Sequence, residues 1–314
     1  MELPSSASFR SPNAMQVAWH FPARSPALQG LVSHSVNSSV SSPGNSSPPC
    51  SKSDEPPSAT APSTACWVAI EQPGPWSSQA LEPGGSRLPD DIARALSTWS
   101  DHGDIKVVLM RSRHRHAIHR MQETRRMYIA PLRSRPGALL RLDLQDVRQI
   151  HDMDPVKFIA GDIAAPLHPE RVDLVCTNGK RDICCAQLGR PLLEQLEAEG
   201  REVWESSHIG GHRFAPVHLS LPDGRIWGRG GELRGSSHLS RAEQALESHY
   251  FSAGIDLFGA LFAQVQISEH SWQVSASLDG KDYSEVVERS ERGLSVESCN
   301  KEAVNGDIFR VKIS

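Results

Sequence analysis

Residues 171–200 read RVDLVCTNGKRDICCAQLGRPLLEQLEAEG, which predicts a strand, a loop and a helix in that order. The apolar run at its start is typical of a buried strand, and the carboxyl end of that strand delivers Cys176. Leucines then recur at helical spacing, at Leu188, Leu192, Leu193 and Leu196. Because strands that alternate with helices build mixed folds, this stretch favours the α/β or α+β class.

The chain before this stretch divides into a polar tail and an ordered region. Residues 1–64 are rich in Ser, Pro, Ala and Asn. Such a segment buries too little apolar surface to offset the entropy lost on ordering, so we predict that it is disordered. Cys50 stands alone in this tail, and we expect no role for it. From residue 66 onward, an apolar run, a helical period at 88–99 and an apolar run at 104–110 predict strand, helix and strand.

The chain after residue 200 continues the mixed pattern. A strand at 202–206 precedes a histidine-containing block, and Pro222-Asp223-Gly224 marks the turn of a hairpin. A helix is expected over 239–251, and the apolar run DLFGALFAQVQI at 256–267 favours a second helix because of its length. Asp279-Gly280 marks another hairpin, and IFRVKI at 308–313 predicts a final strand.

Composition narrows the class of protein. The 314 residues carry a formal charge of −4 and a pI near 6.4, which gives no general attraction to nucleic acid or to an anionic membrane. No apolar run reaches the length of a bilayer span, and no secretory signal pattern begins the chain, so we expect a soluble protein. Three of the six cysteines fall within ten positions, which indicates a reducing compartment, by default the cytoplasm.

Soft metal donors gather in a short part of the sequence. Cys176, Cys184 and Cys185 precede a pair of histidines, His208 and His212, by about the length of a helix and a strand. The glycines at 210 and 211 between the histidines favour a tight loop over a helical turn, and such a loop turns both imidazoles toward one guest. These residue types in this pattern predict a metal or cluster site.

Four interpretations compete for these residues. Zinc accepts two Cys and two His, but its cysteines usually lie two to four residues apart, whereas Cys176 and Cys185 are nine positions apart. A thiol-dependent oxidoreductase using the adjacent Cys184 and Cys185 is disfavoured because neighbouring cysteines bridge only with strain. Simple burial of the cysteines explains each residue singly but not all of them together.

A 2Fe-2S cluster with two Cys on one iron and two His on the other fits the pattern best. Replacing two thiolates by neutral imidazoles removes negative charge and raises the reduction potential. Each histidine also keeps one ring nitrogen that can exchange a proton, so we expect proton-coupled reduction. Lys180, Arg181 and Arg213 would favour the reduced form and attract an acidic partner, and Asp182 would support a histidine ligand.

These residues resemble a known family. CTNGKRDICCAQLGRP and VWESSHIGGHRFAPVHLSLPDG are similar to the sucraseferredoxin-like family, as are ACWVAIEQPGPW and LPDDIARAL further upstream. The resemblance implies a thioredoxin-like ferredoxin domain over 161–314, preceded by a smaller α/β region over 65–160 and by the tail at 1–64. It also implies that Cys176, Cys185, His208 and His212 hold a 2Fe-2S cluster. Cys184 is the alternative ligand, and Cys299, in a motif of the ESCGK type, is expected to serve packing.

The sequence therefore predicts an iron-sulfur redox protein that transfers single electrons to or from a partner protein. We expect an electron carrier more than a catalyst with its own substrate, because no pair of carboxylates suited to glycoside hydrolysis stands out. The alternatives are a zinc-stabilised structural or interaction module and a thiol-dependent oxidoreductase. Nucleic acid and membrane are not expected partners. The electron donor and acceptor are not specified by the sequence.

Overall fold

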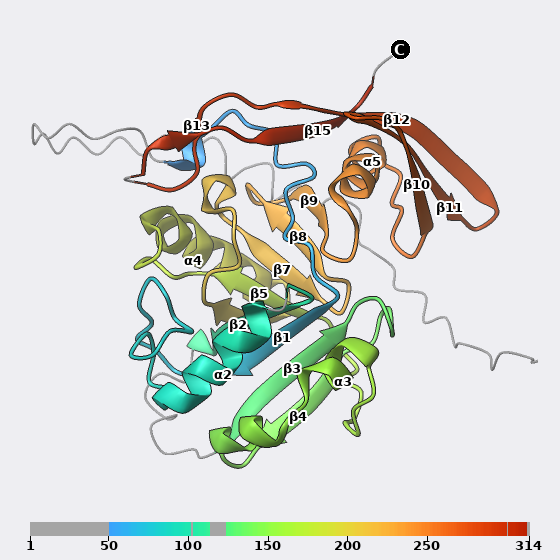
Figure 1. Ribbon diagram of the computed structural model, residues 1–314. Helices are drawn as coiled ribbons and strands as arrows, with labels where there is room; N and C mark the ends of the chain where they lie inside the picture. Colours follow the sequence, from blue (N-terminus) through green and yellow to red (C-terminus); the bar gives the residue numbers. More distant parts are fainter. Residues whose placement is uncertain (1–49, 102, 114–123, 300, 313–314) are drawn as a thin grey trace, which may run out of the picture. The chain divides into compact units, whose positions relative to one another are not determined.

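The computed structural model describes residues 50–101, 103–113, 124–299 and 301–312. Within this part of the chain, a nine-stranded mixed sheet forms the centre of the fold, with the strand order β4-β3-β1-β2-β6-β5-β7-β8-β9 (Figure 1). Its strands are β1 (Cys66–Glu71), β2 (Ile105–Arg111), β3 (Arg125–Pro131), β4 (Leu140–Leu144), β5 (Val172–Cys176), β6 (Glu202–Ser206), β7 (His218–Leu221), β8 (Arg225–Gly228) and β9 (Glu232–Ser236). This mixed α/β organisation confirms the predicted fold class.

The two halves of the large sheet repeat one arrangement. In the first half, β1 leads through helix α2 (Asp90–Asp101) to the parallel strand β2, and β3 and β4 then add antiparallel on the other side of β1. In the second half, β5 leads through α4 (Ile183–Ala198) to the parallel strand β6, and β7 and β8 add antiparallel beside β5. A short antiparallel pairing of β2 with β6 joins the halves.

The strand β1 shows how the sheet is covered on both faces. All six of its residues are buried. Because successive side chains of a strand point to opposite faces, Val68 and Ile70 pack with α2, whereas Trp67 and Ala69 join an apolar cluster that includes Cys176 and Cys185. Two residues of the predicted metal site therefore belong to the apolar core of the large sheet.

The helices begin where the sequence supplies caps. The Asp182 side chain accepts a hydrogen bond from the Cys184 amide and starts α4, and Ser240 with Glu243 forms a capping box at the start of α5 (Arg241–Ser252). The short helix α3 (Pro155–Ala160) has Asp154 as its cap, and the 3-10 helix η4 (Val147–Asp152) precedes it. The predicted helices near 88–99 and 239–251 are confirmed by α2 and α5.

A second, four-stranded sheet packs against α5. It has the order β10-β11-β12-β15 and comprises β10 (Leu261–Ser268), β11 (Ser271–Leu278), β12 (Lys281–Glu291) and β15 (Asp307–Val311). The helix that we expected over residues 256–267 is wrong, because β10 occupies most of this range and pairs antiparallel with β11. The expected hairpins are confirmed, with turns at 222–224 and at 279–280.

The predicted tail needs a correction at its carboxyl end. Residues 1–49 lie outside the described residues, but residues 50–64, which we assigned to the disordered tail, pack against the core. Ala59 and Ala61 are buried, and the amides of Thr60 and Thr64 donate to the carbonyls of Arg234 and Ser237 at 3.2 and 2.7 Å. The short 3-10 helix η1 (Cys50–Lys52) begins this segment. These contacts compensate for the low apolar content that suggested disorder.

The last part of the described chain forms a small two-stranded sheet of β13 (Ser295–Val296) and β14 (Ala303–Val304) before β15. Among the helices of the residues described, none has the length and apolar character that crossing a bilayer requires.

Candidate metal centre

Two buried thiols meet where β5 passes into α4. Cys176 is the last residue of β5 and Cys185 lies in the first turn of α4, and each side chain is almost fully buried. The Cys176 amide donates to the Val217 carbonyl at 3.0 Å, which fixes the end of the strand. Gly189 lets α4 lie directly on this strand end, because a Cβ at Gly189 would stand 2.2 Å from the Cys176 carbonyl oxygen.

The histidines lie on the loop that follows β6. The Ser207 amide donates to the Leu109 carbonyl at 2.8 Å, and the Ser207 hydroxyl accepts from the Leu109 amide at 2.9 Å, so the loop starts from a fixed position beside β2. Gly210 and Gly211 both have positive φ, at 105° and 73°. This backbone conformation disfavours other residues and produces the tight loop that the sequence predicts.

The buried side chain of Arg234 contacts the glycine loop directly. Arg234 donates to the Gly210 carbonyl at 2.8 Å, and a Cβ at Gly211 would stand 2.4 Å from its guanidinium. Burial, together with the charge of Arg213, lowers the pKa of Arg234 to about 9. The glycines are therefore required both for the backbone turn and for the close approach of this side chain.

Three of the four predicted ligands form one group, and the fourth, His212, lies beside His208. The Sγ of Cys176 lies 3.9 Å from the Nδ1 of His208, and these two atoms and the Cys185 Sγ all lie within 4.8 Å of one another. The Nε2 of His208 lies 3.2 Å from the Nδ1 of His212. His212 is thus placed behind His208 and further from the thiols. Its Nε2 is buried and has no hydrogen-bond partner among the described residues.

The electrostatics of the site favour a thiolate at Cys176 and a neutral imidazole at His212. The pKa of the Cys176 thiol falls well below its usual value because Cys185 donates to it and because His208 is beside it. The pKa of Cys185 is correspondingly raised, through the same hydrogen bond and through burial. Burial and the neighbouring His208 lower the pKa of His212 to about 4. A thiolate and neutral imidazoles are the forms that bind metals.

The predicted surrounding residues take up different positions. Asp182 lies close to the site, with its Oδ2 3.8 Å from the Nε2 of His212. Arg181 and His208 line a surface hollow of about 220 Å³, together with Asn178 and Ser207. Lys180 is exposed and lines a separate hollow. Arg213 turns to the buried carboxylate of Glu55, to which its Nε donates at 2.8 Å. Of these three cationic side chains, Arg181 is the one that lines the same hollow as His208.

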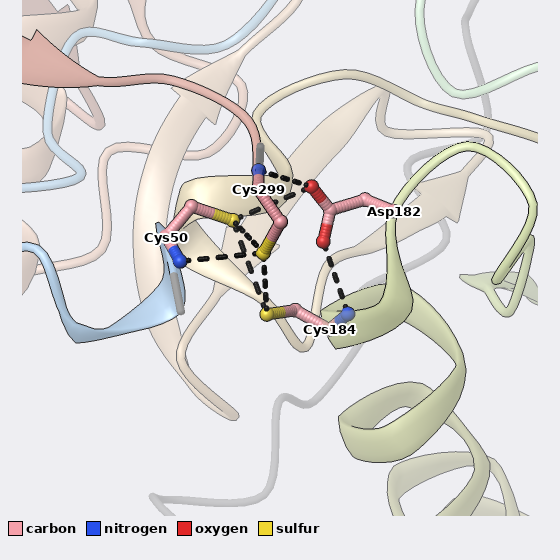
Figure 2. A group of neighbouring side chains, drawn as sticks. All are labelled: Cys50, Asp182, Cys184 and Cys299. Atoms are coloured by element: carbon pink, nitrogen blue, oxygen red, sulfur yellow. Dashed lines mark hydrogen bonds between the residues drawn. The ribbon is translucent and has the colours of Figure 1, made fainter. Parts of the chain in front are cut away.

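The structure places Cys184 in a different group from Cys185. Figure 2 shows Cys184 together with Cys50, Cys299 and Asp182, and three sulfur atoms face one another there. From the sequence we expect no role for Cys50 and a packing role for Cys299. No local spacing could have found this group, because Cys50 and Cys299 are 249 positions apart in the chain. The only local signal was the unexplained second cysteine of the Cys184-Cys185 pair.

The chemistry of the first group suits a metal or an iron-sulfur cluster. Thiolate sulfur and imidazole nitrogen are the donors that zinc and iron-sulfur centres take. The Nε2 of His212 is buried and has no hydrogen-bond partner among the described residues, which is costly without a ligand because buried polar groups normally have a partner. The residues present therefore fit a metal-containing group, and the donor set alone does not distinguish a 2Fe-2S cluster from zinc.

Comparison with known proteins gives one match. The family model described as Sucrase/ferredoxin-like matches residues 57–253, which is more than half of the 314 residues. No curated protein and no solved structure matches the chain. The matched range includes all four predicted ligands, but it leaves out Cys50 and Cys299.

Proposed function

The chain belongs to the Sucrase/ferredoxin-like family, and we propose that it transfers single electrons through a 2Fe-2S cluster. Cys176 and Cys185 would hold one iron, and His208 and His212 would hold the other. The observation that carries this proposal is the arrangement of the donors as a thiol pair and an imidazole pair, side by side and drawn from three segments of the chain.

The position of His212 favours two metal atoms over one. A single zinc ion needs four donors around one point, at about 2.0 to 2.3 Å from the metal. Within the described residues, the donor atoms of Cys176, Cys185 and His208 lie within 4.8 Å of one another, but His212 is outside this group and contacts the far side of the His208 ring. A cluster with two irons gives each pair a metal of its own.

The residues around the ligands would set the properties of the centre. When bound, the cluster supplies a site that gains or loses one electron. The apolar core around Cys176 and Cys185 excludes water from the thiol side. On the other side, His208 is partly exposed beside Arg181, so the imidazole pair is where a proton and a partner would reach the site. If His212 binds the metal through Nδ1, its Nε2–H would point to the Asp182 carboxylate, which would accept a hydrogen bond from it and orient the ring.

A partner protein would dock over the hollow next to His208. Arg181 lines this hollow together with Glu82, and the exposed Lys180, one residue away in the chain, would add the positive charge that attracts an acidic surface. We propose a reducing compartment such as the cytoplasm, where thiols stay available as metal ligands. We propose an electron carrier of this kind, without a substrate of its own.

The test is the iron, sulfide and zinc content of the full chain purified without oxygen, together with its visible spectrum. We expect two irons and two sulfides per chain. Cys185→Ser should lose the colour, whereas the control variant Cys66→Ser should keep it, because Cys66 is a buried thiol on the other face of the sheet. A colourless protein that holds zinc at Cys176 and Cys185 would contradict the proposal and favour a zinc-stabilised module.

Proton coupling has a separate measurement. If a histidine ligand exchanges a proton on reduction, the midpoint potential should fall as pH rises through the neutral to mildly alkaline range. A midpoint potential that does not change with pH would contradict proton coupling but not electron transfer through the cluster.

A further inference from the structure

We propose that Cys50, Cys184 and Cys299 form a second metal site, which binds Zn²⁺ with Asp182 as the fourth ligand. This site uses none of the four residues assigned to the cluster, and among the described residues it is Asp182 that faces both sites. Its ligands come from η1, from the start of α4 and from the segment that follows β13 (Figure 2).

The spacing of the three sulfur atoms suits a tetrahedral ion. The Sγ atoms of Cys50 and Cys299 are 3.2 Å apart, those of Cys184 and Cys299 are 3.4 Å apart, and those of Cys50 and Cys184 are 3.9 Å apart. Zinc bonds to sulfur at about 2.3 Å, so two sulfurs of a tetrahedral site lie roughly 3.8 Å apart. Small side-chain movements would therefore bring all three into a common coordination sphere.

Asp182 is already oriented toward the thiols. Its Oδ2 lies 3.4 Å from the Cys50 Sγ, and the same oxygen accepts hydrogen bonds from the Cys299 amide at 2.9 Å and from the Ser298 hydroxyl at 3.2 Å. Its other oxygen accepts from the Cys184 amide at 3.0 Å. Hydrogen bonds of this kind fix a carboxylate ligand before the metal arrives.

The group is largely buried, with Cys299 partly exposed, and the amino end of a helix faces it. Cys50, Cys184 and Asp182 are buried, and Ala215 and Val296 pack around them. The amino end of α4, a helix of 16 residues, points at the group, and its dipole favours negative charge there. The amide of Cys50 also donates to the Cys299 Sγ at 3.4 Å. A closed site with four protein ligands is typical of structural zinc.

Three thiols fit a metal better than a disulfide. A disulfide can join only two of them, which would leave a third buried sulfur and the carboxylate without a partner of equal strength. A metal ion takes all four donors, and the thiols release their protons to solvent as it binds. No step of oxidation is required.

A metal at this site would join two segments that are distant in the sequence to the start of α4, close to His212. Cys50 and Cys299 are 249 positions apart, and both meet Asp182, whose Oδ2 lies 3.8 Å from the Nε2 of His212. A zinc ion here would close the segment before β1 and the segment after β13 onto the start of α4. It would thereby hold in place the carboxylate that faces the second histidine.

The experiment measures zinc and iron together in the full chain purified without oxygen. We expect one zinc per chain in addition to the iron, and X-ray absorption at the zinc edge should show three sulfurs and one lighter ligand. The variant with both Cys50→Ser and Cys299→Ser should lose the zinc and keep the iron. Cys66→Ser is the matched control, because this buried thiol lies in a separate part of the apolar core. This variant should keep both metals.

Three results would overturn the proposal. They are full iron content without zinc in the unmodified chain, equal zinc in the double variant and the control, and a disulfide between any two of the three cysteines in the anaerobically purified protein. If the double variant is insoluble, the sulfur count at the zinc edge of the unmodified chain decides. If the unmodified chain contains no iron but holds zinc with three sulfurs and one lighter ligand, the proposed cluster is contradicted and this zinc site is supported.

Discussion

A buried carboxylate, Glu55, joins the segment before β1 to the histidine loop and to the end of the chain. It accepts two hydrogen bonds from Arg213, at 2.8 and 2.9 Å, and two from the Nη1 of Arg292, at 3.1 and 3.2 Å. The side chains of Glu55 and Arg292 are 4% and 5% exposed. Burial opposes its charge, but both arginines outweigh that effect and lower the pKa of Glu55. We therefore predict that Glu55→Gln destabilises the protein strongly.

The expected size of this effect follows from leaving buried charges without a counterion. Removing one partner of a buried ion pair costs about 3 to 5 kcal/mol. Glu297 lies 3.3 Å from Arg292 and 3.6 Å from Arg213 and compensates part of the loss, but its side chain is 46% exposed. We therefore expect the lower end, about 3 kcal/mol. For a chain of this size that corresponds to a fall in Tm of roughly 6 to 12 °C.

The assay is urea unfolding followed by tryptophan fluorescence, with thermal unfolding as a second measurement. Glu288→Gln is the matched control, because Glu288 pairs with Lys312 at 2.7 Å on the surface and should contribute less than about 1 kcal/mol. The lowered pKa of Glu55 adds a sign test. Its contribution should be fully present above the ordinary pKa of 4.5 and disappear as pH falls through the lowered pKa of the folded state. If Glu55→Gln and Glu288→Gln have equal stability at neutral pH, the reasoning is refuted.

Three further predictions concern other parts of the fold. Burial, then the charge of Arg201, lowers the pKa of His218 from 6.5 to about 3. The unfolded chain therefore binds a proton more readily than the folded protein, so the free energy of unfolding should be unaffected by this group above pH 6.5 and fall as pH decreases toward 3. At pH 5 this group should lower the free energy of unfolding by about 2 kcal/mol. Urea unfolding at pH 5 and 7.5 should show that His218→Gln lacks this pH-dependent loss, and an unchanged pH dependence would contradict the prediction. Gly189→Ala should cost about 1 to 3 kcal/mol and lower the iron content, because its Cβ would meet the Cys176 carbonyl; exposed Arg190→Ala is the control, and a gain in Tm would count against the clash. Leu246→Ala, in the core between α5 and the second sheet, should cost about 2 to 5 kcal/mol in urea unfolding, and equal stability with exposed Leu261→Ala would contradict it.

The sequence was informative where the pattern was local. The strand that ends at Cys176 and the helix that follows were predictable because apolar periodicity and a capping aspartate lie within thirty residues. The error at residues 256–267 had a visible signal, because Gln264 and Gln266 alternate with apolar residues as in a strand. Length was the wrong criterion there. Pairing with β11 decides the structure, and Leu261 and Val265 remain largely exposed.

The segment at 50–64 was harder to predict from composition. It contains little apolar surface, yet Glu55 and the backbone at Thr60 and Thr64 bind groups that are far away in sequence. Its order therefore depends on Arg213, Arg234 and the turn after β9. Periodicity and composition report nothing about such contacts, because the partners are identified only when the chain has folded.

The adjacent cysteines at 184 and 185 show most clearly what the structure adds. Successive residues of an α-helix point about 100° apart, so neighbours at the start of α4 cannot easily face one small ligand. The structure places Cys185 beside Cys176 and Cys184 beside Cys50 and Cys299. Asp182 lies between the two groups, with contacts to Cys299 and to His212. One helix start can therefore direct a thiol toward each of the two proposed centres, with Cys185 in one group and Cys184 in the other.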